Sequence, residues 1–142
     1  MKSARRQARE IALQALYAWQ LSGDDPLEQA RSMESEGKVD SAFVEILVVG
    51  VRDGMADLQK QIMPFLDRDF SRLSPVERSI LYIGAFELGA HPETPFKVVL
   101  NEAIELGKSY GGTEGHRFVN GVLEKVAAAL RPEEVARARN LA

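Results

Sequence analysis

Apolar residues recur at steps of three or four along almost the whole chain. Between residues 40 and 66, for example, they stand at positions 43, 47, 51, 55, 58, 62 and 66, which is the spacing of a helix face that packs against a core. No stretch alternates apolar with polar residues over the length of a strand, and β-branched residues are scattered. The pattern predicts an all-α protein.

Capping and loop residues divide this pattern into helices at about 3–21, 26–34, 41–66, 75–89, 95–111 and 116–130. The stretch 41–66 is either one long helix or two consecutive ones, because Pro64 must bend or end it. The run from Ser22 to Pro26 and the residues 36–38 predict loops. Ser74, Pro75 and Glu77 form a capping box with proline at the first helical position.

The helical period is lost between 69 and 73, so we predict one domain, 1–142, made of two packed helical halves, about 1–69 and 73–131. The charged tail, 132–142, restarts as a loosely held polar helix to which the sequence assigns no role.

Composition excludes several classes of function. The 142 residues suit one domain of about 100–150 residues, and 45% of them are hydrophobic. The absence of cysteine and the presence of only two histidines exclude thiolate zinc sites, cysteine nucleophiles and a histidine-rich metal centre. No apolar run approaches the roughly 18–20 residues of a membrane span, and the N-terminal segment lacks the apolar core of a signal peptide. We therefore expect a soluble cytoplasmic protein without cofactors.

Charge is distributed unevenly. The whole chain carries 18 basic and 21 acidic residues, a net charge of −3. Residues 1–20 carry Lys2, Arg5, Arg6 and Arg9 against Glu10 alone, a net charge of +3, whereas the remainder carries 14 basic and 20 acidic residues, a net charge of −6. A basic N-terminal helix therefore belongs to an acidic body.

On a helix with about 100° per residue, the four basic side chains fall on one side. The opposite side carries alanines, Ile11 and Trp19 and is expected to pack inward, so the basic residues are expected to lie in water. Leu13, Gln20 and Tyr17 continue the basic side. Guanidinium groups bind phosphates and a tyrosine ring can stack on an unpaired base, so this helix suits single-stranded RNA. A solvated face without a ligand, with Tyr17 in the core, is the alternative.

Three further groups invite interpretation. Glu102 and Glu105 lie three apart and, with Lys108, are typical of pairs along one helix face. The glycine-rich residues 111–115 lack the ending of a P-loop and predict a turn between helices. His116, Arg117 and Phe118 open the next helix, where free amides favour a phosphate. Phe118 either stacks on a base or enters the core.

Four collinear segments resemble the NusB transcription antitermination factor family. They are RRQAREIALQALY at 5–17, LSPVERSIL at 73–81, FKVVLNEAIELGKSYG at 96–111 and FVNGVLEK at 118–125. The resemblance covers nearly the whole chain, although the tail after 130 is longer and more charged than the family core requires. It implies an all-helical fold of two three-helix bundles, without catalytic activity.

The resemblance also implies partners and a site. Proteins of this kind pair with NusE, a small-subunit ribosomal protein, and bind boxA RNA in ribosomal RNA leaders. The assembly joins RNA polymerase and other Nus factors in reading through terminators. Homodimers that could cover the RNA face are an expected further state. The residues carried over as RNA contacts are Lys2, Arg5, Arg6, Arg9, Tyr17 and Phe118.

Two other classes of function are alternatives to RNA binding. A helical protein-interaction adaptor would use the basic helix against an acidic protein surface and bind no RNA. A phosphoryl-transfer enzyme is disfavoured, because the sequence contains no P-loop, no metal cluster and no pair of base and nucleophile. A similar helical domain is also appended to ribosomal RNA cytosine methyltransferases, but a free-standing factor is expected here, because no methyl-donor domain follows.

Overall fold

The computed structural model describes residues 2–34 and 39–140, with the backbone alone for 112–114. These residues form seven α-helices and two short 3-10 helices and contain no strand, so the all-α prediction is confirmed. The predicted loop at 36–38 and residues 141–142 lie outside the described part. The elements in chain order are α1 (Ala4–Ser22), α2 (Pro26–Met33), α3 (Ser41–Ile62), η1 (Met63–Phe65), η2 (Phe70–Arg72), α4 (Pro75–Ala90), α5 (Phe96–Tyr110), α6 (Gly112–Leu130) and α7 (Pro132–Asn140).

Side-chain caps explain where the helices begin. Ser3, Asp25 and Asp40 accept hydrogen bonds from backbone amides in the first turns of α1, α2 and α3. The predicted capping box is present, since Ser74 accepts from the Glu77 amide while the Glu77 carboxylate accepts from the Ser74 amide. The last core helix begins earlier than predicted, at Gly112, which leaves Gly111 as the junction with α5.

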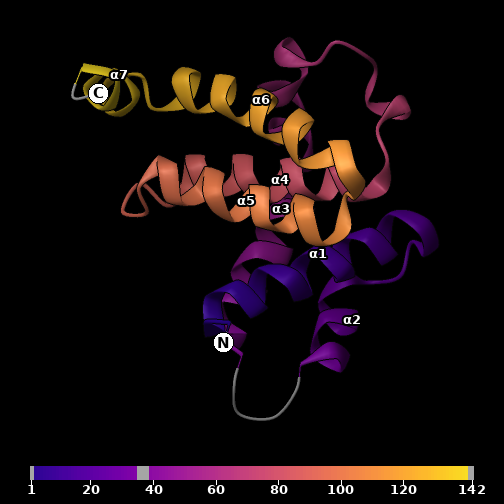
Figure 1. The fold of residues 1–142 in the computed structure, drawn as a ribbon. Coiled ribbons are helices and arrows are strands. Elements are labelled where there is room, and N and C mark those ends of the chain that lie inside the picture. The colour runs from indigo at the N-terminus through magenta and orange to yellow at the C-terminus, as the bar shows by residue number, and fades with distance from the viewer. Residues whose placement is uncertain (1, 35–38, 141–142) are drawn as a thin grey trace.

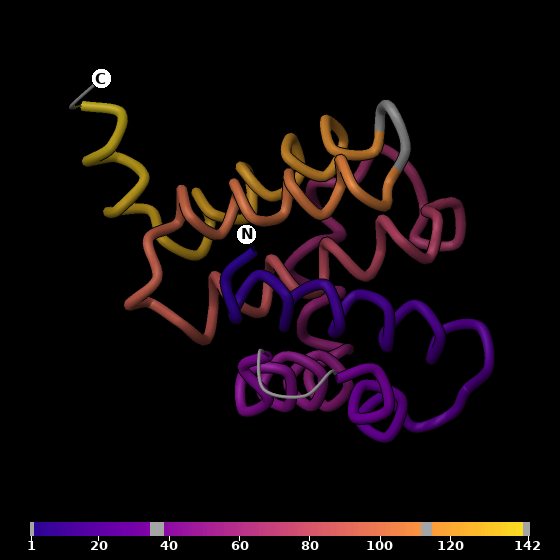
Figure 2. The backbone as a smooth tube through the Cα atoms, turned by 60° about the horizontal axis from the view of Figure 1, so that its bottom comes forward, coloured from indigo at the N-terminus to yellow at the C-terminus, as the bar shows by residue number. Residues whose placement is uncertain are grey.

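The helices pack in two groups that meet along α4 (Figure 1). Helices α1, α2 and α3 pack on one another, and so do α4, α5 and α6; α4 also packs against both α1 and α3. The tube view places α1 between α3 and the group of α4 and α5 (Figure 2). Helices α2 and α3 of its own group pack on α1, and so does α4 of the second group. As a result, α1 is buried on more of its circumference than a surface helix that packs on one side only.

This position corrects the face predicted for α1. Leu13, placed on the basic side by the sequence, is only 1% exposed, and Leu16 is equally buried. Ala4 is exposed and Trp19 is half-buried, although both were expected inside. The burial of Leu13 has its reason in the second group of helices, because α1 also packs against α4.

Gly50 is required where α3 passes close to α4. A Cβ atom at this position would lie 2.3 Å from the Phe86 ring. The glycine that weakens the helical propensity of α3 therefore permits the contact between the two helices.

The C-terminal helix is anchored, contrary to the prediction of a loosely held tail. Arg131 is 8% exposed and donates hydrogen bonds to the carbonyl oxygens of Glu87, Leu88, His91 and Thr94. Glu134 accepts a hydrogen bond from the backbone N–H of Phe96 at 2.8 Å and pairs with Arg131. Val135 is buried. The residues after α6 thus fasten the connection between α4 and α5.

Among the described residues, no helix combines the length and the apolar character needed to cross a membrane.

Candidate nucleic-acid interface

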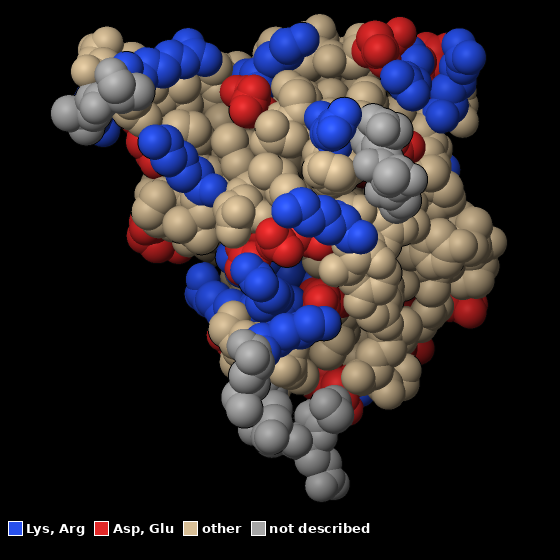
Figure 3. Space-filling view, viewed as in Figure 1, with Lys and Arg blue, Asp and Glu red and all other residues tan. Residues whose placement is uncertain are grey.

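The basic residues of the N-terminal segment lie among acidic side chains. In the space-filling view, Lys and Arg side chains gather at the lower left, where α1 begins, with Asp and Glu side chains between them (Figure 3). Lys2 and Arg5 are exposed and Arg6 is half-buried, whereas Arg9 is only 4% exposed. The prediction that all four basic side chains lie in water is therefore wrong for Arg9.

Arg9 is buried because its side of α1 faces α4. Its Nε and Nη2 atoms donate to the two carboxylate oxygens of Glu87 at 2.9 and 2.8 Å, a bidentate pair whose side chains are 5% and 2% exposed. Burial opposes the charge on Arg9, but the hydrogen bonds and charge of Glu87 and the charge of Glu102 outweigh it and raise the pKa of Arg9. This pair joins the first and second groups of helices.

Glu102 connects Arg9 to Arg6. Its carboxylate accepts from Nε of Arg6 at 3.0 Å and pairs with Nη2 of Arg6 at 2.9 Å and with Nη1 of Arg9 at 3.3 Å. The interpretation of Glu102 as part of a pair along its own helix is therefore wrong, whereas Glu105 does lie 3.8 Å from Lys108. Hydrogen bonding to Glu102 is the largest cause of the raised pKa of Arg6.

The outer basic residues, Lys2 and Arg5, are exposed and each has one acidic partner. Lys2 pairs with Glu10 at 2.8 Å, and the hydrogen bond to this carboxylate raises the pKa of Lys2. Arg5 lies 3.7 Å from Asp40, and its guanidinium carbon stands 4.1 Å from the centroid of the buried Phe43 ring. Because exposed ion pairs contribute little stability, Lys2 and Arg5 can exchange these partners for a phosphate at small cost.

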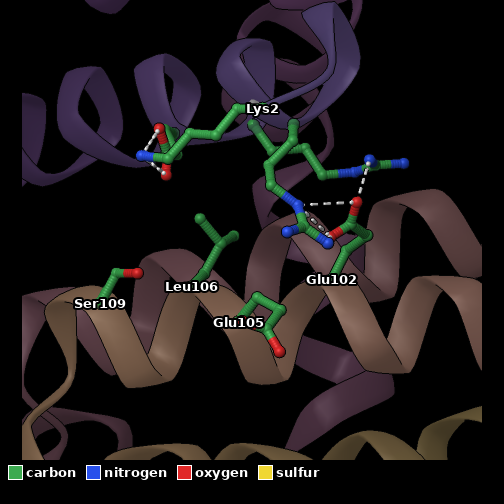
Figure 4. A pocket seen from close by; sticks show the side chains of 8 residues that line it. Lys2, Glu102, Glu105, Leu106 and Ser109 are labelled. Atoms are coloured by element: carbon green, nitrogen blue, oxygen red, sulfur yellow. Dashed lines mark hydrogen bonds and ion pairs between the residues drawn. The ribbon is translucent and has the colours of Figure 1, made fainter.

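A cavity of about 100 Å³ separates the start of α1 from α5. The close-up shows α1 above and α5 below, with Lys2 on one side and Glu102, Glu105, Leu106 and Ser109 on the other (Figure 4). Its lining mixes both charges, and the dashed lines that end on Glu102 mark ion pairs that already join α1 to α5 across it. This arrangement fixes side chains in place and presents donors at its rim.

Tyr17 is the exposed aromatic residue that the sequence predicted for this side, with 39% of its surface accessible. One turn earlier, Gln14 donates a hydrogen bond to the hydroxyl of Tyr110 at 3.1 Å, which ties α1 to the end of α5. Tyr110 is itself 37% exposed. Sequence reasoning missed Tyr110; its place in the last turn of a helix that ends in a glycine was the only available signal.

Phe118 lies apart from these contacts on α6. It is half-buried and packs on the core, which agrees with the core alternative. The guanidinium carbon of Arg68 stands 4.6 Å from its ring centroid, and Arg68 is held by a 2.7 Å pair with Asp67. Hydrogen bonding to Arg68 lowers the pKa of Asp67. One face of the Phe118 ring thus already carries a stacked arginine, a contact that the sequence did not indicate.

These groups can bind but offer no assembled reactive centre. In the described part of the chain, no three His, Cys, Asp or Glu side chains cluster in a way that could hold a metal ion. Arginine and lysine donors, together with exposed aromatic rings, are the groups that contact phosphates and bases.

Comparison with known proteins decides the family. The model of the NusB family matches residues 6–128. The chain belongs to the NusB family. A transcription antitermination protein NusB of Azoarcus sp. (strain BH72) is 51% identical to it over 97% of this chain and 92% of that protein. The corresponding protein of Dechloromonas aromatica (strain RCB) is also 51% identical, over 95% of this chain and 85% of that protein. These names describe a transcription factor, which confirms the expectation of a function without catalysis.

Solved structures of this family share the fold. T. maritima NusB superimposes with a TM-score of 0.85 at 28% identity, covering 96% of this chain and 99% of that one. A second chain comes from a crystal structure of the antitermination factors NusB and NusE in complex with double-stranded RNA. It gives a TM-score of 0.79 at 27% identity, over 87% of this chain and 96% of that one.

Proposed function

We propose that this chain acts in transcription antitermination by binding boxA RNA of ribosomal RNA leaders together with NusE. The pair would join RNA polymerase and other Nus factors and help the polymerase to read through terminators, and so would act in the cytoplasm. The observation that carries the proposal is the membership of residues 6–128 in the NusB family. A similar chain crystallised with NusE and RNA adds support.

The proposed RNA contacts are outward-facing residues of α1 and of the segment that precedes it. Lys2 and Arg5 neutralise phosphates, since both basic side chains are exposed and each has a single acidic partner to exchange. Arg6 reaches the RNA with the part of its side chain that Glu102 leaves accessible, and Tyr17 stacks on a base.

The two remaining predicted contacts have other roles in this proposal. Arg9 acts as a positioning residue, because both edges of its guanidinium are engaged by carboxylates. Phe118 forms a second contact region together with the guanidinium of Arg68.

A protein-interaction adaptor without RNA binding is the second candidate. The observation in its favour is that acidic side chains lie beside all four basic residues of the N-terminal segment. Such neutralisation reduces the positive potential on which non-specific RNA binding depends.

Binding of the full chain to boxA RNA, with and without NusE, separates these candidates. We would compare single-stranded boxA, the same sequence in a duplex and a scrambled RNA over a series of salt concentrations. A boxA preference supports the proposal. Equal binding of all three RNAs would indicate charge attraction alone. Binding of NusE with no binding of any of the three RNAs would favour the adaptor.

A charge-matched pair of variants locates the interface. Lys2→Ala with Arg5→Ala is expected to weaken boxA binding and to reduce the slope of log K against log salt by about 0.7 for each lost phosphate contact with single-stranded RNA. Arg137→Ala with Arg139→Ala removes the same charge from α7, at the other end of the molecule (Figure 1), and should leave the slope nearly unchanged. Equal effects of the two double variants would exclude the start of α1 as the site.

A further inference from the structure

The ion pairs at the start of α1 differ in how firmly they are held. Lys2 and Arg5 are exposed and each pairs with a single carboxylate, and the Nε atom of Arg5 lies 3.7 Å from its partner. The pair between Arg6 and Glu102 is different, because Glu102 is also held by a second arginine, Arg9.

Arg9 cannot release Glu102 easily. Its guanidinium is fixed by the bidentate bond to Glu87, and both side chains are at most 5% exposed. The carboxylate of Glu102 therefore lies against an immobile positive group from one helix while it binds Arg6 from the same helix. A phosphate that approaches Arg6 meets a fixed negative charge and cannot simply displace it.

Glu102 also determines how Arg6 is oriented. Two atoms on one edge of the guanidinium, Nε and Nη2, face the carboxylate. Because the guanidinium is a planar fork, the edge that carries Nη1 is then directed away from Glu102. The Arg6 side chain keeps 37% of its surface accessible, so this edge is what an incoming ligand can reach.

We propose that Glu102 is a specificity-determining residue for RNA binding. Its charge repels any RNA backbone that approaches Arg6, and its hydrogen bonds hold Arg6 in the one orientation that a correctly placed phosphate can use. Non-specific RNA, which binds through charge alone, is disfavoured; a specific RNA gains from the fixed donor. This inference rests on the RNA-binding function proposed above.

The test compares Glu102→Gln with Glu105→Gln. Both substitutions remove one negative charge from α5 while preserving side-chain size, but Glu105 lies one turn away, contacts only Lys108 among its described ion pairs and does not hold an arginine of α1. Binding of the full chain with NusE is measured for single-stranded boxA RNA and for a scrambled RNA of the same composition, over a series of salt concentrations.

We expect Glu102→Gln to bind the scrambled RNA about three- to tenfold more tightly, because one charge beside a phosphate has been removed. Its affinity for boxA should stay equal or fall, since Arg6 is less firmly oriented. The ratio of the two affinities therefore decreases. Glu105→Gln should change both affinities by the same small factor and leave the ratio unchanged.

A third variant separates charge from orientation. Glu102→Asp keeps the charge but shortens the side chain, so it should leave scrambled RNA weakly bound while boxA affinity falls. It also serves as the test should Glu102→Gln fold poorly, which thermal melting of each variant would reveal.

The outcomes are distinguishable. Unchanged discrimination in Glu102→Gln, or an equal loss in Glu105→Gln, overturns the role of Glu102 and leaves the RNA-binding function in place. Equal binding of boxA and scrambled RNA by the unmodified chain with NusE overturns the proposed function and this inference together.

Discussion

Replacement of Arg9 by methionine tests whether the buried pair with Glu87 holds the two groups of helices together. Methionine fills a similar volume but leaves the Glu87 carboxylate, 2% exposed, without its bidentate partner. Removal of one member of a buried ion pair costs about 3–5 kcal/mol, because the remaining charge stays desolvated. At roughly 3 °C per kcal/mol for a chain of this size, the melting temperature should fall by roughly 10–15 °C.

The double variant Arg9→Met with Glu87→Leu provides the control. Both charges are absent from the contact between α1 and α4, and Glu102 keeps its bond to Arg6. A well-packed apolar pair can replace a buried ion pair without loss of stability, so the double variant should regain about 2 kcal/mol or more relative to Arg9→Met. Urea denaturation monitored by circular dichroism gives these free energies of unfolding.

Two results would refute this reasoning. A melting temperature of Arg9→Met within about 3 °C of the unmodified protein would show that the Glu87 charge does not need Arg9. A double variant no more stable than Arg9→Met would show that the loss comes from packing and not from an unpaired charge.

Two further predictions concern stability. Gly50→Ala should destabilise the fold by about 1–2 kcal/mol, because the new methyl group would collide with the Phe86 ring. Gly54→Ala, one turn later with open space around it, should stabilise the fold by about 0.5–1 kcal/mol. Equal effects of the two substitutions in urea denaturation would contradict the clash. For Glu134, the hydrogen bond from the Phe96 amide lowers the pKa of the carboxyl below its ordinary value of 4.5. Its contribution is therefore complete above pH 4.5 and is lost as the pH falls through the lower, folded-state pKa. The stability difference between the unmodified chain and Glu134→Gln should be constant near neutral pH and shrink in acid; a difference independent of pH would contradict it.

The helices of this protein were predictable because their signals are local. The capping box at Ser74 and Glu77 depends on residues three positions apart, and the structure contains it. The exact helix boundaries were predicted less accurately. For example, α6 begins at Gly112, within the glycine-rich stretch that was predicted to be a turn.

The candidate site was predicted less completely. Exposure of Lys2, Arg5 and Tyr17 was predicted from their place on one side of the N-terminal segment, and the structure agrees with it. The partners of Arg9 and Arg6 lie 78 and 96 residues further along the chain, so no spacing rule connects them. Arg68 and Tyr110 were missed for the same reason, since their contacts with Phe118 and Gln14 join segments that are far apart in the sequence.

The sequence by itself determined an all-α chain, its helix starts other than that of α6, a basic N-terminal segment and, through four collinear motifs, its family. Only the tertiary structure decided which basic side chains of that segment stay accessible and which carboxylates they pair with. A helical wheel assigns one buried face and one exposed face to a helix. Because α1 packs against α4 as well as against α2 and α3, Leu13 and Arg9 are buried too. Carboxylates from α4 and α5 then met the arginines, and a net charge of +3 in the sequence became a set of ion pairs that leave only part of each cation available to a ligand.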